Sequence, residues 1–528
     1  MLVTLWLIIA PRTPDLAAQV YRVGLFDHLG FAVWDEHWYA GHHLPGYSLL
    51  FPPLASLLGL RLLAALSVLA SVALFERLAF TVFGPSARWG ATWFALAAAG
   101  DIWIGRLTFA LGVSLALAAV FALVRRWSFL AVVLAALCAA ASPIAGVLLA
   151  LAGLTGTLYR RSTQAVLVLA APAAGVVIPL TLLFPEGGFE PYPILPFVAT
   201  LIVVLAFLWA LPPSQRLLRL GGLVYLLACL LCLVVHTPIG SNIERYAVLL
   251  AGPLLLCALL ARGEGPAGAD GLGAGDGRAG HRGRSTPAMV IALCVIAVWV
   301  GWGPVRETLA VAGNESTRAS YYTPVKRFLA GLSGAPVRVE VPLTRSHWEA
   351  ALLAPTVSLA RGWEKQLDTR FDRVLLAPGL TAVSYYAWLR EQAVAYVALP
   401  DTPLDPSSAQ EGRLIRRGLS YLSEVFASRH WLIYAVRAPT PLISGPGRLT
   451  SLGHDSFTLR AFSAGDFLVR VRYTRYFALT RGAGCVGPAP GGWTFMRARA
   501  PGTIVVAARF SLARAFASGG SCSRSGST

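Results

Sequence analysis

The sequence predicts a polytopic α-helical membrane protein of about eleven spans, followed by a C-terminal part that lies outside the membrane. Three observations support this fold class. The 528 residues are 56% hydrophobic and only 13% charged, whereas a soluble domain usually carries about 25% charged residues. Several apolar runs approach the ~20 residues that are needed to cross a bilayer. From residue 304 onward, the composition changes to that of a soluble domain.

The expected spans follow apolar runs with basic flanks. The first run, residues 1–10, is only about half of the ~20 residues required, so we expect that its helix is incomplete or that the true start lies upstream. Residues 127–159 contain Ser142 and Pro143 and have basic pairs at both ends, which favours two short helices that return to the same side over one long helix. The other spans are expected at 62–80, 89–104, 107–124, 165–183, 195–211, 221–235, 247–260 and 289–302.

Arginine residues are concentrated in the loops on one side of the predicted spans. This bias places those loops in the cytoplasm and the C-terminal part outside the cytosol, in a multi-pass protein of the plasma membrane. The net charge of +18 is divided between short loops and a C-terminal third without a basic block, which argues against nucleic acid as a partner. The acids show the opposite bias, and those expected on the outer side are Asp15, Asp27, Asp35, Glu36, Asp101, Glu186, Glu190 and Glu244.

Residues 11–53 form the first external loop, and we predict that they hold the functional site. The loop contains four of the nine histidines and four acids, in a chain where charge is scarce. Residues 14–30 have helical periodicity, which suits an interfacial helix on the outer membrane surface with Asp15 in its first turn. From that residue alone, a simple helix cap is the stronger interpretation. Sugar stacking or an aromatic belt at the membrane interface would explain Trp34, Trp38, Tyr39 and Tyr47.

The order of residues in this loop resembles the first external loop of the C-type glycosyltransferase (GT-C) superfamily. An Asp follows the first span, and an amphipathic helix comes next. Gly30 and Trp34 then stand at a Gly-x-x-x-Trp spacing, before the run WYAGH at 38–42 and the run PPL at 52–54 that opens the next helix. The resemblance covers the loop well and the overall layout loosely.

The resemblance implies that a sugar is moved from a polyprenyl-phosphate donor to a cell-envelope glycan or lipid acceptor outside the cytosol. Asp15 matches the catalytic acidic residue after the first span, and Asp101, at the tip of the next external hairpin, matches the second acidic position. The chain differs from many members in its pair of Asp35 and Glu36, and it lacks a clean Asp-x-Asp. Use of a divalent cation (Mg²⁺ or Mn²⁺), with Asp15 and Asp101 as candidate ligands, therefore stays open.

The chemistry of sugar transfer fits these residue types. A base must take the proton of the acceptor hydroxyl, and a carboxylate that has lost water near lipid suits that role. The departing lipid phosphate needs a cation, for which Arg245 and Arg106 are candidates, although Arg245 could equally be an anchor at a helix end. His37, His42 and His43 match no closed zinc pattern, so we favour hydrogen bonds to an acceptor or interfacial packing. The residues that we predict to bind substrate are Asp35, Glu36, Trp38, Tyr39, His42, His43, Arg106, Glu244 and Arg245.

Five parts of the chain are expected. A transmembrane domain at 1–303 contains a cytoplasmic Gly-rich linker at 262–287, and an extracytoplasmic α/β domain follows at 304–440. A β-sandwich-like domain is predicted at 441–516, before a loose tail at 517–528.

Within the α/β domain, strands are expected at 337–342, 394–400 and 430–436, and helices at 381–392 and 411–427. Residues 361–371 and 388–401 resemble actinobacterial membrane proteins of this layout. Cys485 and Cys522 lie in the polar part, and we state as a hypothesis that they form a disulfide outside the cytosol.

Two other classes of function compete with a glycosyltransferase. A transporter or a flippase of lipid-linked sugars would usually show repeated halves and polar residues at the membrane midplane, whereas the acids here gather at one face. A non-catalytic membrane anchor that displays a carbohydrate-binding domain would leave the acidic loop at 11–53 unexplained.

Overall fold

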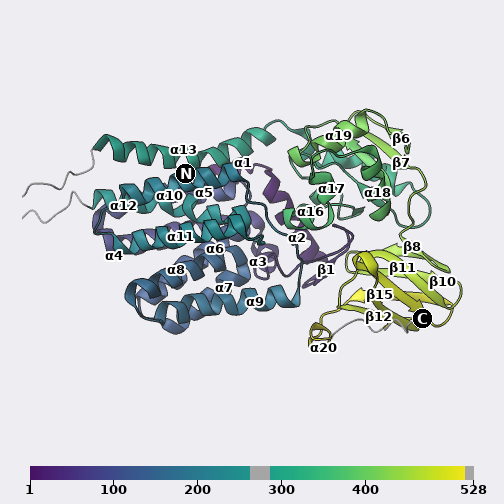
Figure 1. Cartoon of the computed structure of the whole chain (residues 1–528), viewed down its shortest axis with the longest axis horizontal. Coiled ribbons are helices and arrows are strands. Elements are labelled where there is room, and N and C mark those ends of the chain that lie inside the picture. The colour runs from purple at the N-terminus through teal and green to yellow at the C-terminus, as the bar shows by residue number, and fades with distance from the viewer. Residues whose placement is uncertain (262–285, 518–521, 523–528) are drawn as a thin grey trace, which may run out of the picture. The chain divides into compact units, whose positions relative to one another are not determined.

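The computed structural model describes residues 1–261, 286–517 and 522, which form two compact units (Figure 1). The expected linker at 262–287 lies outside the described residues apart from its last two, and so does the expected tail apart from Ala517 and Cys522. The helical unit comprises Met1–Pro11, Ser48–Pro179 and Phe189–Leu309, and the mixed unit comprises Arg12–Tyr47, Leu180–Gly188 and Ala310–Thr528.

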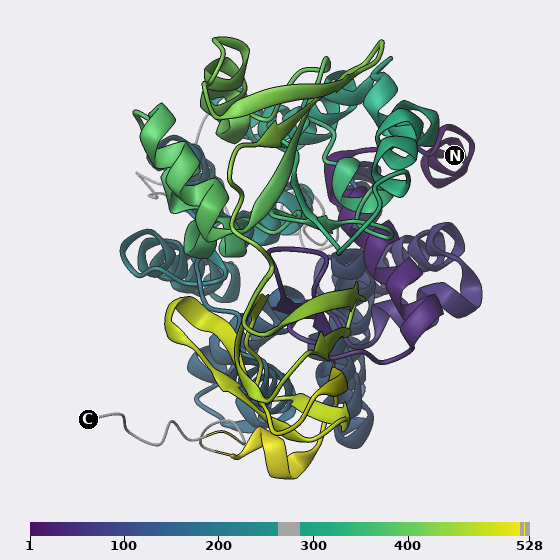
Figure 2. The same ribbon diagram turned by 90° about the vertical axis from the view of Figure 1, so that its right-hand side faces the viewer.

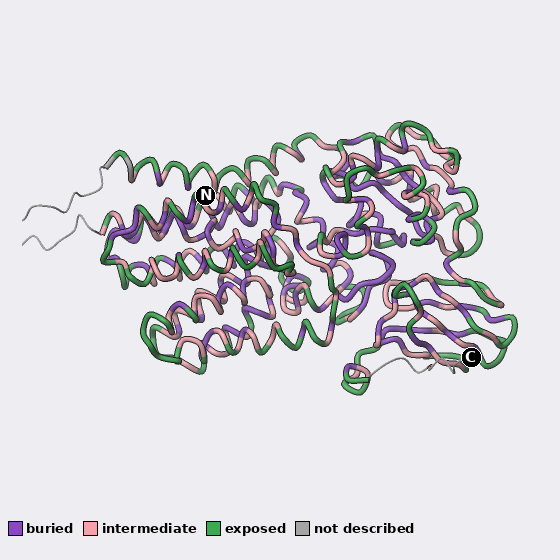
Figure 3. Tube along the Cα trace, viewed as in Figure 1, coloured by how far each residue is buried: buried purple, intermediate pink, exposed green. Residues whose placement is uncertain are grey.

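The helical unit is built from apolar helices. Seven helical segments among the described residues are long and apolar enough to cross a membrane, by length and composition, and two shorter apolar helices accompany them. Many residues along these helices are exposed (Figure 3). Large apolar residues are among them: Leu69 is 56% exposed, Ile202 52% and Leu227 59%. Such surfaces suit lipid, and they confirm the membrane class; the number of spans stays a prediction. The helices are α1 (Leu2–Ile9), α3 (Phe51–Leu58), α4 (Leu60–Phe83), α5 (Ala87–Trp103), α6 (Leu107–Val124), α7 (Ser128–Ala141), α8 (Pro143–Arg160), α9 (Ala171–Leu183), α10 (Ile194–Ala210), α11 (Arg216–Val234), α12 (Glu244–Leu260) and α13 (Thr286–Val311).

The break at Ser142 and Pro143 divides the run 127–159 into α7 and α8, as the first of the two interpretations predicted. Pro143 cannot donate a backbone hydrogen bond, and the Ser142 hydroxyl caps α8 by accepting from the Ala145 N–H. The two helices then pack closely, because a Cβ atom at Gly146 would lie only 2.7 Å from the Cβ of Ala139.

The mixed unit contains a five-stranded sheet in the order β4-β3-β5-β7-β6. β3 pairs parallel with β4 and β5, and the other pairs are antiparallel. Helix α18 (Ala382–Glu391) leads into β5, as expected. The helix expected at 411–427 is wrong in its second half: α19 (Ala409–Arg416) ends before Gly418, whose positive φ of 83° favours glycine, and the chain continues as a strand. The strands are β3 (Arg338–Glu340), β4 (Ser358–Leu359), β5 (Val394–Pro400), β6 (Leu422–Ala427) and β7 (Trp431–Val436).

A β-sandwich follows in the same unit, with two four-stranded sheets in the orders β12-β15-β10-β9 and β13-β14-β11-β8 (Figure 2). Its core is formed by inward-facing apolar side chains such as Phe457, Phe467 and Val506. Cys485 and Cys522 are joined by a disulfide, which confirms the predicted pairing. The strands are β8 (Ile443–Ser444), β9 (Gly447–Leu452), β10 (Ser456–Ala461), β11 (Gly465–Arg472), β12 (Phe477–Arg481), β13 (Gly484–Pro488), β14 (Trp493–Ala498) and β15 (Gly502–Ala508). Together with the sheet, the sandwich confirms the predicted fold class; its location outside the cytosol stays a prediction.

The first loop belongs to the mixed unit and packs inside it. It forms α2 (Pro14–Leu29) and a two-stranded ribbon of β1 (Trp34–Asp35) and β2 (His42–His43). The expectation that α2 lies on the membrane surface is wrong, because its apolar face is buried in the core of the α/β domain, where Tyr21 stacks on Trp38 at 4.4 Å. Trp34 enters the sandwich core instead, edge-on to Phe477. The loop therefore contributes one tryptophan to a core cluster of the α/β domain and one to the sandwich core.

Candidate functional site

The predicted site residues are divided between the two units. Asp101, Arg106, Glu244 and Arg245 belong to the helical unit, and the other predicted residues belong to the mixed unit. The latter are Asp15, Asp35, Glu36, Trp38, Tyr39, His42 and His43.

In the helical unit, a tight turn joins α5 to α6 and carries the first pair of charges. Gly105 has a positive φ of 91° at this turn, and the backbone N–H of Arg106 donates to the Asp101 carbonyl oxygen at 3.0 Å. The Arg106 guanidinium lies 3.5 Å from the Asp101 carboxylate. Asp101 is only 3% exposed, and its buried carboxylate lies beside the positive charge of Arg106.

The first turn of α12 adds a second pair of charges. The carboxylate of Glu244 interacts electrostatically with Arg106, and its buried Oε1 has no hydrogen-bond partner among the described residues. The guanidinium of Arg245 donates to the Asn242 side-chain oxygen at 2.5 Å and lies 5.2 Å from the ring centre of Phe109. Helices α5, α6 and α12 thus bring four of the predicted residues into one charged cluster.

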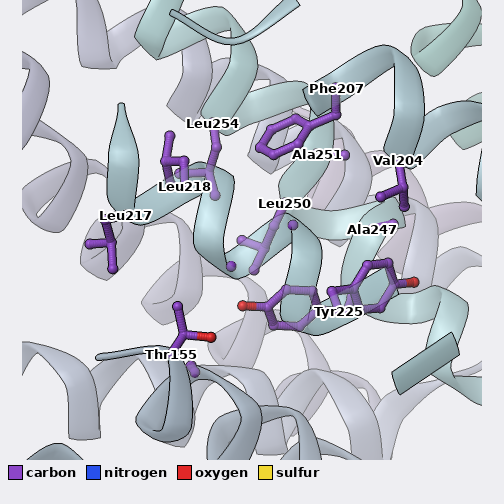
Figure 4. A pocket seen from close by; sticks show the side chains of 14 residues that line it. Thr155, Val204, Phe207, Leu217, Leu218, Tyr225, Ala247, Leu250, Ala251 and Leu254 are labelled. Carbon is purple, nitrogen blue, oxygen red and sulfur yellow. The ribbon is translucent and has the colours of Figure 1, made fainter. Parts of the chain in front are cut away.

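An apolar cavity of about 210 Å³ lies between α8, α10, α11 and α12 of the same unit (Figure 4). Tyr225 connects it to the charged cluster, because its hydroxyl donates at 3.0 Å to the carbonyl oxygen of Ile243, the residue before Glu244. Tyr246, two residues farther along α12, lines the cavity and faces the Tyr225 ring at 5.3 Å. An apolar chain that occupied this cavity would have its end close to charged groups.

In the mixed unit, Asp35 lies at the centre of a buried polar network. Its carboxylate accepts from the Tyr21 hydroxyl at 2.8 Å and lies 2.9 Å from His454 Nδ1. Burial alone would raise the pKa of Asp35, but its interactions with the neighbouring histidines, above all the hydrogen bond with His454, lower it. Asp35 therefore stays ionised inside the unit and fixes the orientation of His454.

Glu36 differs from its neighbour. It is fully buried, neither carboxylate oxygen has a partner among the described residues, and burial and the charge of Asp35 raise its pKa. Burial also lowers the pKa values of His37 and His42, which favours their neutral forms. No group of three or more His, Cys, Asp or Glu side chains in the described part of the chain is placed to hold a metal ion. That Asp15 and Asp101 hold a divalent cation stays a prediction.

Trp38, Tyr39 and His43 hold the loop in place. The Trp38 indole donates to the Ala350 carbonyl oxygen at 3.1 Å, and the Tyr39 hydroxyl donates to Asp368 at 3.0 Å. His43 lies 3.0 Å from the carboxylate of Glu186 and is 9% exposed. All three side chains are buried and make contacts within the unit, and contact with substrate stays a prediction for them.

Asp15 lies in the first turn of α2, where it is half-buried. Two buried residues that the sequence interpretation did not select, Gln19 and Arg22, follow it at i+4 and i+7, which places all three on one face of the helix. That spacing is the signal that could have identified them. Arg22 donates to Glu364 at 2.6 Å and stacks on the Tyr47 ring at 3.7 Å.

Comparison with known proteins gives matches among solved structures. No protein-family model matches the chain, and no curated protein matches it. Among solved structures, the chain is similar to two cryo-electron microscopy structures of a mutant of the arabinofuranosyltransferase AftD from mycobacteria, with TM-scores of 0.43 and 0.42 and 14% sequence identity. The matches cover 94% and 96% of this chain and 58% of those chains. Likeness at this level leaves function to be inferred from the residues of this chain.

Proposed function

We propose that the chain is a membrane glycosyltransferase that moves a sugar, a pentose or a hexose, from a polyprenyl-phosphate donor to a cell-envelope glycan or lipid acceptor on the outer face of the plasma membrane. The observation that carries the proposal is the charged cluster of Asp101, Arg106, Glu244 and Arg245 beside an apolar cavity. Charges that are buried among membrane helices, as Asp101 is, are costly unless they serve a site or have a polar partner.

The donor fits this arrangement in two parts. Its polyprenyl tail would occupy the apolar cavity, where burial of each CH₂ group contributes about 0.8 kcal/mol. Its phosphate would be bound by the guanidinium groups of Arg106 and Arg245, which can form paired hydrogen bonds with phosphate oxygens. Asp101 and Glu244 keep Arg106 in place until the donor arrives, and Asn242 does the same for Arg245. The charge of the two acids favours release of the product phosphate.

Asp15 is the proposed general base. It would take the proton from the acceptor hydroxyl while that oxygen attacks the anomeric carbon of the donor sugar. The new glycosidic bond forms as the bond between the anomeric carbon and the phosphate oxygen breaks, and polyprenyl phosphate leaves with the electron pair. Mg²⁺ or Mn²⁺, if the enzyme uses one, would neutralise the departing phosphate.

The test is sugar transfer by the full chain in proteoliposomes, with polyprenyl-phosphate donors that carry one pentose or one hexose. We expect Asp15→Asn to lower kcat at least about 100-fold, because a general base contributes about 10²–10⁴-fold. Asp27→Asn is the matched control, because Asp27 is exposed near the other end of α2. Full activity of Asp15→Asn would refute the role of this residue, and absence of transfer by the unmutated chain from every donor would refute the function.

A further inference from the structure

Three buried polar side chains of the first loop each carry at least one atom without a hydrogen-bond partner among the described residues. Gln19 Oε1, the Nε and one terminal nitrogen of Arg22, and His42 Nε2 have no hydrogen-bond partner among the residues that the structure describes. The three side chains are 2%, 6% and 1% exposed. A buried polar group without a partner costs about 1–3 kcal/mol, so such groups rarely gather without a ligand or bound water.

These side chains converge. Gln19 donates to the Tyr47 hydroxyl, and the Arg22 guanidinium lies 3.7 Å from the centre of the same Tyr47 ring. Arg22 also lies 5.1 Å from the Trp38 ring, on which His42 stacks at 5.5 Å. Arg22 therefore lies beside both aromatic rings, Gln19 beside Tyr47 and His42 beside Trp38, and Gln19 and Arg22 share their helix face with Asp15.

The hydrogen-bonding capacity of the cluster is mixed. His42 Nδ1 lies 3.2 Å from the Asp35 carbonyl oxygen, which can only accept, so the proton sits on Nδ1 and Nε2 is an acceptor. Gln19 Oε1 is a second acceptor, and the free N–H groups of Arg22 are donors. A group that both donates and accepts hydrogen bonds, such as a sugar hydroxyl, complements all three.

The surrounding charge decides between a neutral and an anionic ligand. The cation of the cluster, Arg22, already faces Glu364, and Glu186 interacts electrostatically with both Glu364 and His42. Arg370 lies beside Glu186, where its guanidinium donates to the Glu186 backbone oxygen. Burial raises the pKa of Glu364 to about 7, despite the opposing effect of Arg22. Because both arginines already face acidic residues, this surrounding favours a neutral sugar over a phosphate.

We propose that Gln19, Arg22 and His42 form a subsite for the hydroxyl groups of a neutral sugar, namely a sugar ring of the acceptor glycan. The inference rests on the proposed function, in which Asp15 on the same helix face activates an acceptor hydroxyl. In that arrangement the subsite orients the acceptor.

Binding of neutral sugars tests the subsite without any transfer reaction. The full chain in nanodiscs is studied by saturation-transfer NMR with methyl glycosides of a neutral pentose and a neutral hexose, and with inorganic phosphate as the anionic probe. We expect Gln19→Leu to weaken sugar binding about three- to tenfold, which is the effect of one neutral hydrogen bond. Gln164→Leu, at an exposed position, is the matched control.

Thermal unfolding adds a readout that a purely structural role would lower. Gln19→Leu removes an unsatisfied acceptor together with the hydrogen bond that Gln19 donates to Tyr47, and because these two effects oppose each other, the melting temperature without sugar should change little. A second variant, His42→Phe, keeps a ring against Trp38, removes the other acceptor, and should weaken sugar binding as well. Equal sugar binding by both variants and the control, binding of phosphate but of no sugar, or a lower melting temperature of Gln19→Leu with unchanged sugar binding would each overturn the subsite.

Transfer assays separate this inference from the function on which it rests. If both are correct, Gln19→Leu raises the acceptor KM and leaves the donor KM and kcat nearly unchanged. If the chain transfers no sugar but the sugar probes bind in a Gln19-dependent way, the proposed function fails and the subsite stands. If transfer occurs but the acceptor KM of Gln19→Leu equals that of the unmutated chain, the subsite fails alone.

Discussion

Arg472 of the β-sandwich binds the backbone of the first loop at Ala40: its N–H donates to the Ala40 carbonyl oxygen at 2.8 Å. Its guanidinium donates to the preceding carbonyl, that of Tyr39, at 3.2 Å, and lies 3.7 Å from the ring centre of Phe371. Tyr39 and Ala40 both have positive φ values, 55° and 61°, which residues other than glycine rarely adopt. Arg472 therefore holds a strained turn that the loop would otherwise release.

Replacement of this arginine should loosen the loop. Arg472→Gln keeps the backbone contact but removes a buried guanidinium with several hydrogen bonds, so we expect the free energy of unfolding to fall by about 2–4 kcal/mol. Limited proteolysis should then cut near Ala40. Arg460→Gln, which changes an exposed arginine of the same sandwich, should behave like the unmutated chain. Equal resistance of both variants would show that the turn is held by other contacts.

The tryptophans of the first loop should stabilise different cores. Trp34 packs in the sandwich core and Trp38 in the α/β core, so truncation of each to alanine leaves a cavity in a different place and costs about 3–5 kcal/mol. Hydrogen exchange should show lost protection in β11 and β15 for Trp34→Ala, and in β3 and β5 for Trp38→Ala. Trp302→Ala, at an exposed site of α13, is the control. Identical exchange patterns in the two loop variants would contradict this division.

Acidification should lower the stability of the folded chain through protonation of His37. Burial and the charge of His454 lower the pKa of His37, whereas the Asp35 charge and the Ala354 carbonyl oppose this shift. In the unfolded chain, His37 binds a proton near pH 6.5, whereas in the folded chain it does so only at lower pH. The contribution of neutral His37 to the free energy of unfolding is therefore complete above about pH 6.5 and is lost as the pH falls below that value. Glu364, whose raised pKa is about 7, acts in the opposite direction, since its protonated folded form gains stability as the pH falls.

The test therefore compares how much stability the unmutated chain and a His37 variant lose on acidification. Thermal unfolding at pH 7.5 and pH 5.5 should show a larger loss of stability on acidification for the unmutated chain than for His37→Asn. His28→Asn, at the exposed end of α2, should follow the unmutated chain. If His37→Asn and the unmutated chain lose equal stability, His37 does not titrate as the structure indicates.

The sequence predicted the membrane class, three strands of the five-stranded sheet and the sandwich, because each rests on a local pattern of apolar residues. It did not predict what covers α2. Leu16, Val20 and Leu25 mark an apolar face, but lipid and a protein core 300 residues farther along the chain present the same apolar partner. For the same reason Gln19 and Arg22 were not selected, since their importance depends on burial that no local pattern shows. In the helical unit the sequence singled out acids and arginines, because charge in a membrane helix is rare enough to suggest a site, and their role there stays a prediction.

The apolar cavity gives a prediction that depends on the tail of the donor and not on its sugar. Ala251 lines the cavity on α12, and Ala251→Leu adds three carbon atoms to a space of about 210 Å³. If the polyprenyl chain binds there, the KM for a long-tailed donor should rise several-fold, whereas a donor with a two-isoprene tail should be used almost as before. Ala73→Leu, at an exposed position of α4, controls for the added apolar surface. An equal change for both donors would instead mean that the substitution disturbs the charged cluster near the start of α12, because that cluster would meet the phosphate of either donor.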